Sequence, residues 1–396
     1  MNLILFDDSA KNNLLPLTFT RPVAEIRIGI LTIKEKWEKH LHATASFKTD
    51  NYLSEKYPLT ISETSDNIWI NGSICPNEAL VAEIKSLKTL HQLVYDNIIV
   101  AYNSGKETID FTVATATYTK KASSHKQLFK IENLWDIFSK NEQAITDDFE
   151  LIAKGRKSKK LSTTNQIIGE ESIFVEEGAK VECAILNAST GPIYIGKNAE
   201  IMEGSIVRGP FALCESSTLK LGAKIYGPTT IGPHCKVGGE VNNSVILGYS
   251  NKAHDGFLGN AVIGEWCNIG ADSNNSNLKN NYAAVKLWNY STERFVNTGL
   301  TFCGLIMGDH SKCGINTMFN TGTVVGVSAN IFGSGFPRNF VPSFSWGGAN
   351  GFTTYKLNDA LETASKAFDR RNIRFDDTEK EILRNVFELT EKYRKI

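Results

Sequence analysis

An aliphatic residue stands at every sixth position along much of the second half of the chain. The first uninterrupted run consists of Ile195, Ile201, Val207, Leu213, Leu219, Ile225, Ile231 and Val237. The pattern stops near Asn242 and returns in two later runs, which are Phe257, Ile263 and Ile269, and then Met307, Cys313, Phe319, Val325 and Ile331. A small residue stands two positions before most of these, as at Ala199, and glycine often follows, as at Gly196 and Gly232.

A period of six matches neither an α-helix nor a simple alternating strand. It is typical of a chain that runs straight for a few residues, turns and repeats, so that three sides close one triangular coil. The aliphatic residue then points inward and stacks on its copies in neighbouring coils, while glycine relieves crowding at the turns. A sandwich with turns at multiples of six by chance is the alternative. Because long in-phase runs recur, we expect a solenoid over residues 160–345.

The first part of the chain lacks this period. Leu3–Phe6 reads as a buried strand, and Asn77 precedes apolar residues at helical spacing from Leu80 onward, as a helix cap would. Strands that alternate with helices predict an α/β domain over residues 1–155. The basic segment Ala153–Lys160 is interpreted as a solvated linker rather than a phosphate-binding patch.

The last segment, residues 350–396, is helical in pattern. Two apolar stripes at helical spacing are Leu357, Leu361, Ala364 and Phe368, and then Ile382, Val386, Leu389 and Tyr393. We expect two helices that cap the open end of the solenoid or pack on a neighbouring subunit.

Composition narrows the function classes. The 43 basic residues equal the 43 acidic ones, which argues against nucleic acid as a partner. No apolar run approaches the roughly 18–20 residues of a membrane span, and no basic region precedes Leu3–Phe6, so neither a membrane span nor a secretory signal is expected. The seven cysteines are scattered without a CxxC pair, which favours a reduced, cytoplasmic location.

The repeat resembles the hexapeptide-repeat family, whose fold is a left-handed parallel β-helix. Within it, Ala253–Ala261 (AHDGFLGNA), followed by Asn268–Ala271 (NIGA), is similar to the acetyltransferase half of the bifunctional N-acetylglucosamine-1-phosphate uridylyltransferase/glucosamine-1-phosphate N-acetyltransferase family. The resemblance implies that His254 is the general base and that Asn268 contacts substrate. It also implies a homotrimer with acetyl-CoA bound between adjacent solenoids. The tyrosine of the family motif is Phe257 in this sequence.

A second stretch adds candidates for the substrate site. Ser276–Asn280 (SNLKN), followed by Lys286, resembles an Asn-Leu-Arg segment and later lysines in archaeal-type sugar-1-phosphate nucleotidylyltransferases that carry an acetyltransferase helix. That resemblance implies substrate contacts for Asn277, Lys279 and Lys286. The excursion from 272 to about 300 leaves the period of six, and solenoid enzymes place functional loops at such excursions.

The implied chemistry is consistent with these residue types. An amino sugar must lose a proton before its nitrogen attacks the acetyl-CoA thioester, and a neutral imidazole near pH 7 is a suitable acceptor. Backbone N–H groups at the coil turns can stabilise the negative oxygen of the transition state. The sugar phosphate needs cations, and Lys279, Lys286 or Arg208 would supply them.

The N-terminal segment Leu14–Pro22 (LLPLTFTRP) resembles the Pro-Leu-Thr segment of sugar nucleotidylyltransferases. In that family a Gly-rich loop after the first strand holds the triphosphate; here no glycine occurs between Asp7 and Asn13. Arg21 and Arg27 are therefore candidates for nucleotide binding. Asp7 and Asp8 are candidates for Mg²⁺ binding, because carboxylate oxygens suit that ion.

The leading hypothesis is an acetyltransferase acting on glucosamine 1-phosphate or a related amino-sugar 1-phosphate, coupled to nucleotidyl transfer that gives a UDP-N-acetylamino sugar for cell-envelope precursors. One alternative is a nucleotidylyltransferase with a β-helix that only oligomerises it, and another is a non-catalytic scaffold that binds nucleotide sugars. A zinc-dependent carbonic anhydrase on the same solenoid is disfavoured, because His234, His254 and His310 are far apart in the sequence.

Overall fold

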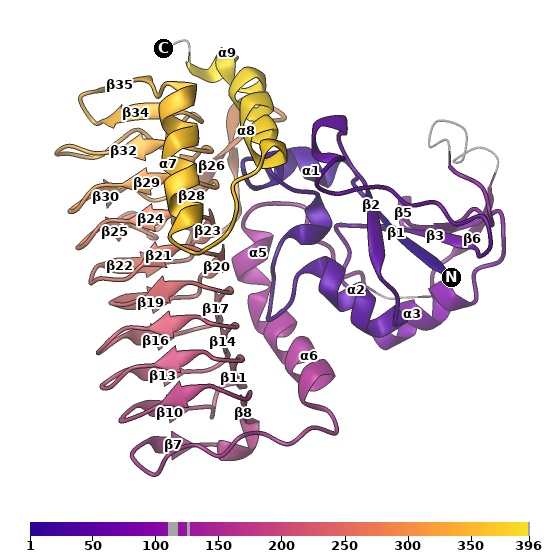
Figure 1. The fold of residues 1–396 in the computed structure, drawn as a ribbon, viewed down its shortest axis with the longest axis horizontal. Helices are drawn as coiled ribbons and strands as arrows, with labels where there is room; N and C mark the ends of the chain where they lie inside the picture. Colours follow the sequence, from indigo (N-terminus) through magenta and orange to yellow (C-terminus); the bar gives the residue numbers. More distant parts are fainter. Residues whose placement is uncertain (110–117, 125–126, 395–396) are drawn as a thin grey trace. The chain divides into compact units, whose positions relative to one another are not determined.

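The computed structural model describes residues 1–109, 118–124 and 127–394, which form two compact units. One contains Met1–Leu14, Thr20–Ile26 and Leu31–Asn133, and the other contains Leu15–Phe19, Arg27–Ile30 and Leu134–Ile396. The first unit is the α/β part and the second contains the solenoid, so the predicted fold class is confirmed (Figure 1). The boundary predicted near residues 155–160 stays a prediction.

The first unit is a mixed sheet with the strand order β2-β1-β3-β5-β4-β6. Its strands are β1 (Asn2–Phe6), β2 (Ala45–Lys48), β3 (Asn67–Asn71), β4 (His91–Tyr95), β5 (Ile98–Asn103) and β6 (Thr119–Ala122). Its helices are α1 (Ala10–Asn13), α2 (Ile33–Leu41) and α3 (Glu78–Lys85). The predicted cap is confirmed, because the Asn77 side chain accepts a hydrogen bond from the Leu80 amide at the start of α3.

Three parallel sheets form the sides of the solenoid in the second unit. The first face contains β7 (Gln166–Ile168), β10 (Ile185–Asn187), β13 (Ile206–Arg208), β16 (Lys224–Tyr226), β19 (Glu240–Asn242) and β22 (Phe257–Gly259). The second contains β8 (Ile173–Val175), β11 (Ile193–Ile195), β14 (Phe211–Leu213), β17 (Thr229–Ile231), β20 (Val245–Gly248), β23 (Val262–Glu265), β28 (Ile306–Met307), β31 (Val324–Val325) and β33 (Phe340–Val341). The third contains β9 (Lys180–Val181), β12 (Glu200–Ile201), β15 (Thr218–Leu219), β18 (Lys236–Val237), β21 (Asn251–Lys252), β24 (Asn268–Ile269), β29 (Lys312–Cys313), β32 (Asn330–Ile331) and β34 (Ser345–Gly348), with β35 (Gly351–Thr354) antiparallel to β34.

The period of six corresponds to the inward positions of these strands. Every member of the first run, from Ile195 to Val237, is at most 1% exposed and belongs to one continuous core. Beyond Val237 the sides of the coil shorten, and Val241, Ile246 and Leu258 occupy the inward positions. The expectation for Phe257 was therefore wrong: the shortened side turns Leu258 inward and leaves Phe257 only partly buried.

The remaining elements include one further parallel strand pair of the solenoid, whose Phe319 belongs to the core, and a hairpin that leaves the solenoid. The strand β25 (Asn274–Asn275) pairs with β30 (Met318–Phe319), and β26 (Lys286–Asn289) forms a hairpin with β27 (Arg294–Asn297). The excursion predicted from 272 to 300 is confirmed by this hairpin. The helices of this unit are α5 (Asp136–Ser139), α6 (Asn141–Ala153), α7 (Leu357–Asp369), α8 (Asp377–Leu389) and α9 (Glu391–Arg394).

Helix α7 runs along the side of the solenoid and not across its open end (Figure 1). Its apolar stripe buries Leu361, Ala364 and Phe368, as the spacing predicted. The Phe368 ring stacks on Trp266, with ring centroids 3.8 Å apart, at the corner between the second and third faces. For α7 the expected end cap was wrong, because the helix packs on the aromatic surface of this corner, and packing of the helices on a neighbouring subunit stays a prediction.

Candidate functional site

His254 lies in the turn that joins β21 on the third face to β22 on the first, and its side chain is exposed. Gly256 in this turn has φ +115°, and a Cβ there would lie 2.2 Å from the carbonyl oxygen of Ser273 in the next coil. Only glycine fits so close an approach at this backbone angle. Local sequence therefore builds a tight corner that presents His254 to solvent.

A buried lysine fixes the main chain of this corner. Lys252 occupies the inward position of β21, paired with Val237, and is 3% exposed. Its ammonium donates hydrogen bonds to the carbonyl oxygens of His254, at 2.7 Å, and Gly238, at 3.0 Å. Burial lowers the pKa of Lys252 from 10.5 to about 8, although Asp255 and Asp272 favour its charged form. The sequence pattern did not reveal this residue, because the period of six breaks at this coil.

Asparagine side chains line the strand that follows His254. The backbone amide of Phe257 donates to Asn274 Oδ1 at 2.7 Å, and that of Gly259 donates to Asn275 Oδ1 at 2.9 Å. Asn277 Nδ2 donates to Asn260 Oδ1 at 2.8 Å, near the end of β22. The predicted residues His254 and Asn277 thus flank the two ends of β22.

The other predicted substrate residues are spread over the second unit. Lys279 Nζ donates to the Ala284 carbonyl in its own loop at 3.2 Å, and Lys286 is exposed on the β26–β27 hairpin. Arg208 is on β13, three strands from β22 on the first face, which corresponds to roughly 14 Å. Asn268 is on the third face, on the other side of the His254 corner. Of the predicted substrate residues, only Asn277 lies beside β22, the strand that follows the His254 turn.

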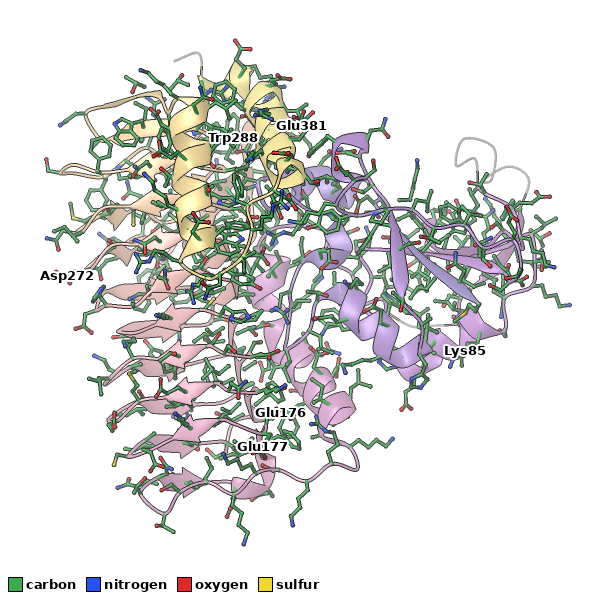
Figure 2. All side chains as sticks on the ribbon, in the orientation of Figure 1. Lys85, Glu176, Glu177, Asp272, Trp288 and Glu381 are labelled. Carbon is green, nitrogen blue, oxygen red and sulfur yellow. The ribbon has the colours of Figure 1, made fainter. Side chains whose placement is uncertain are left out.

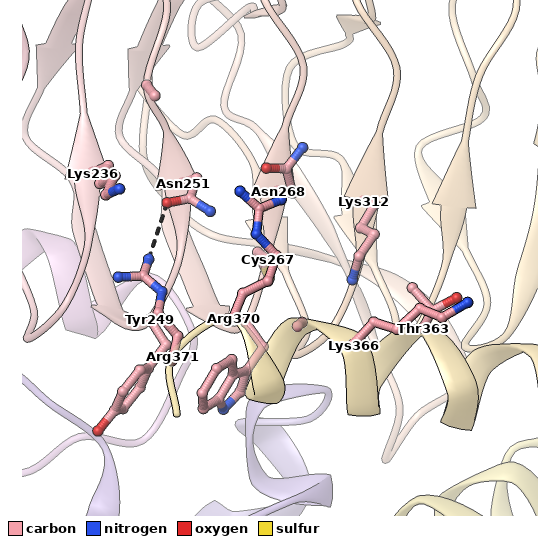
Figure 3. A pocket seen from close by; sticks show the side chains of 13 residues that line it. Lys236, Tyr249, Asn251, Cys267, Asn268, Lys312, Thr363, Lys366, Arg370 and Arg371 are labelled. Atoms are coloured by element: carbon pink, nitrogen blue, oxygen red, sulfur yellow. Dashed lines mark hydrogen bonds between the residues drawn. The ribbon is translucent and has the colours of Figure 1, made fainter. Parts of the chain in front are cut away.

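A cleft of about 550 Å³ lies between α7 and the third face. The polar side chains that line it from the strands come from four consecutive coils: Lys236, Asn251, Asn268 and Lys312. Thr363, Lys366, Arg370 and Arg371 line it from α7 and the turn that follows. Figure 3 shows the two arginines reaching from the end of α7 toward the strands that carry Asn251 and Asn268. Ala253, the neighbour of His254, also lines the cleft.

The charge of this cleft is positive. No carboxylate lines it, and within the described part of the chain Lys236, Lys312, Arg370 and Arg371 form no ion pair. Arg371 donates to Asn251 Oδ1 at 3.3 Å, and Lys312 donates to the His310 carbonyl at 3.0 Å. Burial lowers the pKa of Lys312.

A stack of rings supports one wall of the cleft. His234, Tyr249 and Trp266 occupy the same corner in successive coils, with centroid distances of 4.8 Å and 4.4 Å between neighbours. All three have positive φ, from 53° to 60°, so the same corner geometry repeats. Burial and then nearby Arg371 lower the pKa of His234. His234 therefore acts as part of the ring stack.

The carboxylates predicted to bind Mg²⁺ are engaged within the first unit. Asp7 Oδ1 accepts from the Val23 amide at 2.8 Å, and Oδ2 lies 3.2 Å from Lys11 Nζ. Burial raises the pKa of Asp7, against the effect of Lys11. Asp8 Oδ2 lies 3.1 Å from Lys130 Nζ, and Oδ1 accepts from the Ala10 amide at the start of α1. Across the described residues no group of three or more metal-ligating side chains occurs, so Mg²⁺ binding finds no support.

The two predicted nucleotide-binding arginines belong to different compact units. Arg21 is 3% exposed in the first unit. Arg27 is 9% exposed in the second unit and donates to the Ile30 carbonyl. The Thr230 hydroxyl holds the neighbouring Gly29 carbonyl at 2.9 Å, so the segment around Arg27 is packed on the solenoid. Nucleotide binding by this pair stays a prediction.

Comparison with known proteins supports the character of the first unit. Residues 3–157 match the family model described as sugar nucleotidyl transferase. The N-terminal domain is therefore nucleotidyltransferase-like. A search of curated proteins finds no match to the chain. In the described residues no helix has the length and apolar character needed to cross a membrane.

Solved structures of an acetyltransferase and of acyltransferases match parts of this chain at low identity. The polySia-specific acetyltransferase NeuO is 14% identical over 53% of this chain and 100% of its own, with a TM-score of 0.28. The Arabidopsis UDP-N-acetylglucosamine acyltransferase is 16% identical over 60% of this chain and 83% of its own, with a TM-score of 0.24. The Campylobacter jejuni UDP-N-acetylglucosamine acyltransferase is 17% identical over 59% and 83%, with a TM-score of 0.19.

Proposed function

We propose that the protein transfers an acyl group from a thioester donor, acetyl-CoA in the simplest case, to the amine of an amino-sugar 1-phosphate. Glucosamine 1-phosphate is the first acceptor to test. The observation that carries this proposal is His254: an exposed imidazole on a turn whose main chain is fixed from inside by Lys252. A base held in place by its backbone and free at its side chain suits proton removal from a bound amine.

The surroundings of His254 supply the other parts of the reaction. In this account the amine loses its proton to His254, and its nitrogen attacks the thioester carbon. The negative oxygen that forms needs N–H donors, and the backbone amides of the His254 turn are the candidates for this role. Collapse of the intermediate expels the thiolate, which takes up a proton to leave as the free thiol. Phe257, where the related motif has tyrosine, supplies no hydroxyl for a substrate contact.

The test is release of CoA from acetyl-CoA with glucosamine 1-phosphate, measured for the wild type, His254→Asn and His42→Asn. His42 is an exposed histidine in the first unit, so it matches the chemical change at a position away from the His254 turn. We expect His254→Asn to lower turnover by about 10²–10⁴, the usual contribution of a general base, and His42→Asn to leave it unchanged. Equal rates for all three proteins would refute the role of His254.

The match of residues 3–157 favours a second activity, nucleotidyl transfer to the sugar 1-phosphate. Its test is pyrophosphate release from UTP or dTTP in the presence of N-acetylglucosamine 1-phosphate. Release that persists in His254→Asn would assign this activity to the first unit alone. Tight binding of a nucleotide sugar without release would instead support the scaffold alternative. A homotrimer with acetyl-CoA between adjacent solenoids stays part of the proposal, and sedimentation analysis tests it.

A further inference from the structure

The cleft between α7 and the third face has the features of a binding site that is complete within one chain. Its volume of about 550 Å³ lies in the range of small-molecule sites. Helix α7 closes one side because its buried stripe is anchored on Trp266 through Phe368. The adjoining stripe of α7, with Thr363, Ala367 and Arg370, then faces the cleft.

The unbalanced charge of the cleft identifies the chemistry of its ligand. Two arginines enter from the end of α7, and Lys236 and Lys312 enter from strands three coil steps apart. These four cations form no ion pair in the described chain, so an anion that binds among them meets net positive charge. Arginine side chains also present paired N–H donors that fit phosphate oxygens.

The aromatic residues of the cleft indicate which part of a ligand it recognises. Tyr249 and Phe368 both stack on the Trp266 ring, at 4.4 Å and 3.8 Å, and His234 stacks on Tyr249 at 4.8 Å. Ring faces already covered in this way offer no surface on which a nucleobase can stack. Recognition must therefore come from the cations and the amides of Asn251 and Asn268.

We propose that this cleft binds the phosphate groups of a phosphorylated small molecule, using Arg370 and Arg371 from the end of α7 together with Lys236 and Lys312 from the third face. Two sources fit this chemistry, the diphosphate of an acyl donor such as CoA and the diphosphate of a nucleotide sugar. Ala253 lines one part of the cleft beside His254. The assignment of a source rests on the proposed function, whereas phosphate binding itself does not.

The experiment is isothermal titration of the full chain with CoA, UDP and inorganic pyrophosphate, without any turnover. We expect one site per chain, a Kd that rises with salt, and competition of pyrophosphate with the nucleotides. The variant Arg370→Gln/Arg371→Gln should raise the Kd by about tenfold or more for each lost charge-assisted contact. The matched control is Arg374→Gln, an exposed arginine of the same segment that does not line the cleft, and its Kd should equal that of the wild type.

A second variant on another element, Lys312→Gln, guards against misfolding of α7 as the cause of lost binding. Loss of binding in both variants, with thermal melting unchanged, supports the site. Preferential binding of CoA identifies the acyl donor as the source, and preferential binding of UDP identifies the nucleotide sugar. Failure of all three probes to bind, or equal affinities in wild type and both variants, would overturn the proposal. Because no step involves His254, loss of acyl transfer in His254→Asn leaves this result unaffected.

Discussion

The buried Lys252 makes the free energy of unfolding depend on pH, and replacing this lysine with methionine should remove its contribution to that dependence. The ammonium sits in an inward position that aliphatic residues occupy in the neighbouring coils, as at Val237 and Ile269. Its pKa falls from 10.5 to about 8 because burial disfavours the charged form. At about 1.4 kcal/mol for each pH unit, the charged lysine costs the folded state roughly 3 kcal/mol at neutral pH.

The direction of the pH effect follows from proton binding. Between pH 8 and 10.5 the unfolded chain binds more protons at Lys252 than the folded chain does. The free energy of unfolding therefore rises with pH across this window, and the cost is fully present below pH 8. From about pH 7 to about 9.5 the wild type should gain about 2 kcal/mol of stability that a Lys252→Met protein does not gain.

The assay is urea unfolding at several values of pH, followed by tryptophan fluorescence and circular dichroism. The difference between wild type and Lys252→Met isolates the lysine from the other titrating groups. Lys224→Met is the matched control, since Lys224 precedes the inward Ile225 on β16, its side chain is exposed, and it does not line the cleft. Parallel pH profiles for wild type and Lys252→Met would refute the argument that a charged lysine is buried in this coil.

Three further predictions concern local features. Of the seven cysteines only Cys183 is exposed, and burial raises the pKa of Cys235 and of Cys303 to about 12, so a thiol reagent should modify about one thiol per native chain; fast modification of several would contradict this burial. Phe368→Ala should lower the free energy of unfolding by about 3–5 kcal/mol and expose α7 to limited proteolysis, whereas unchanged digestion would show that α7 is held elsewhere. Gly256→Ala should lower acyl transfer, because the new Cβ would displace the His254 turn against Ser273; full activity would show that the turn tolerates the shift.

The solenoid could be predicted because each coil repeats the same burial requirement. Inward positions such as Ile231 and Val237 must be apolar, and this requirement produces the period of six in the sequence. The pattern was less informative where the sides of the coil are shorter. There the inward position shifts by one residue, so that Leu258 is buried where the period of six predicted Phe257. Lys252 escaped prediction for the same reason, and also because a charged residue at an inward position breaks the usual rule.

Long-range packing limits what the sequence predicts about the site. The apolar stripe of α7 correctly predicted which face of the helix is buried. The surface on which this face packs includes Trp266, which lies about a hundred residues earlier and gives no local signal in the sequence of α7. The sequence analysis assigned Arg208 and Asn268 to the same substrate site as His254, but the coils of the solenoid place both of them away from His254. Arg208 lies on the same face as β22 but three strands away, and Asn268 lies on the next face, beyond the His254 turn.

The most direct test of the central claim follows the acyl group itself. Acetyl-CoA labelled in the acetyl group is incubated with glucosamine 1-phosphate and enzyme, and the products are identified by mass spectrometry. We expect wild-type protein to place the label on the sugar amine and His254→Asn to do so at a rate lower by about 10²–10⁴. Label that remains on CoA or appears only as free acetate, or equal labelling of the amine by both proteins, would contradict acyl transfer at the His254 turn.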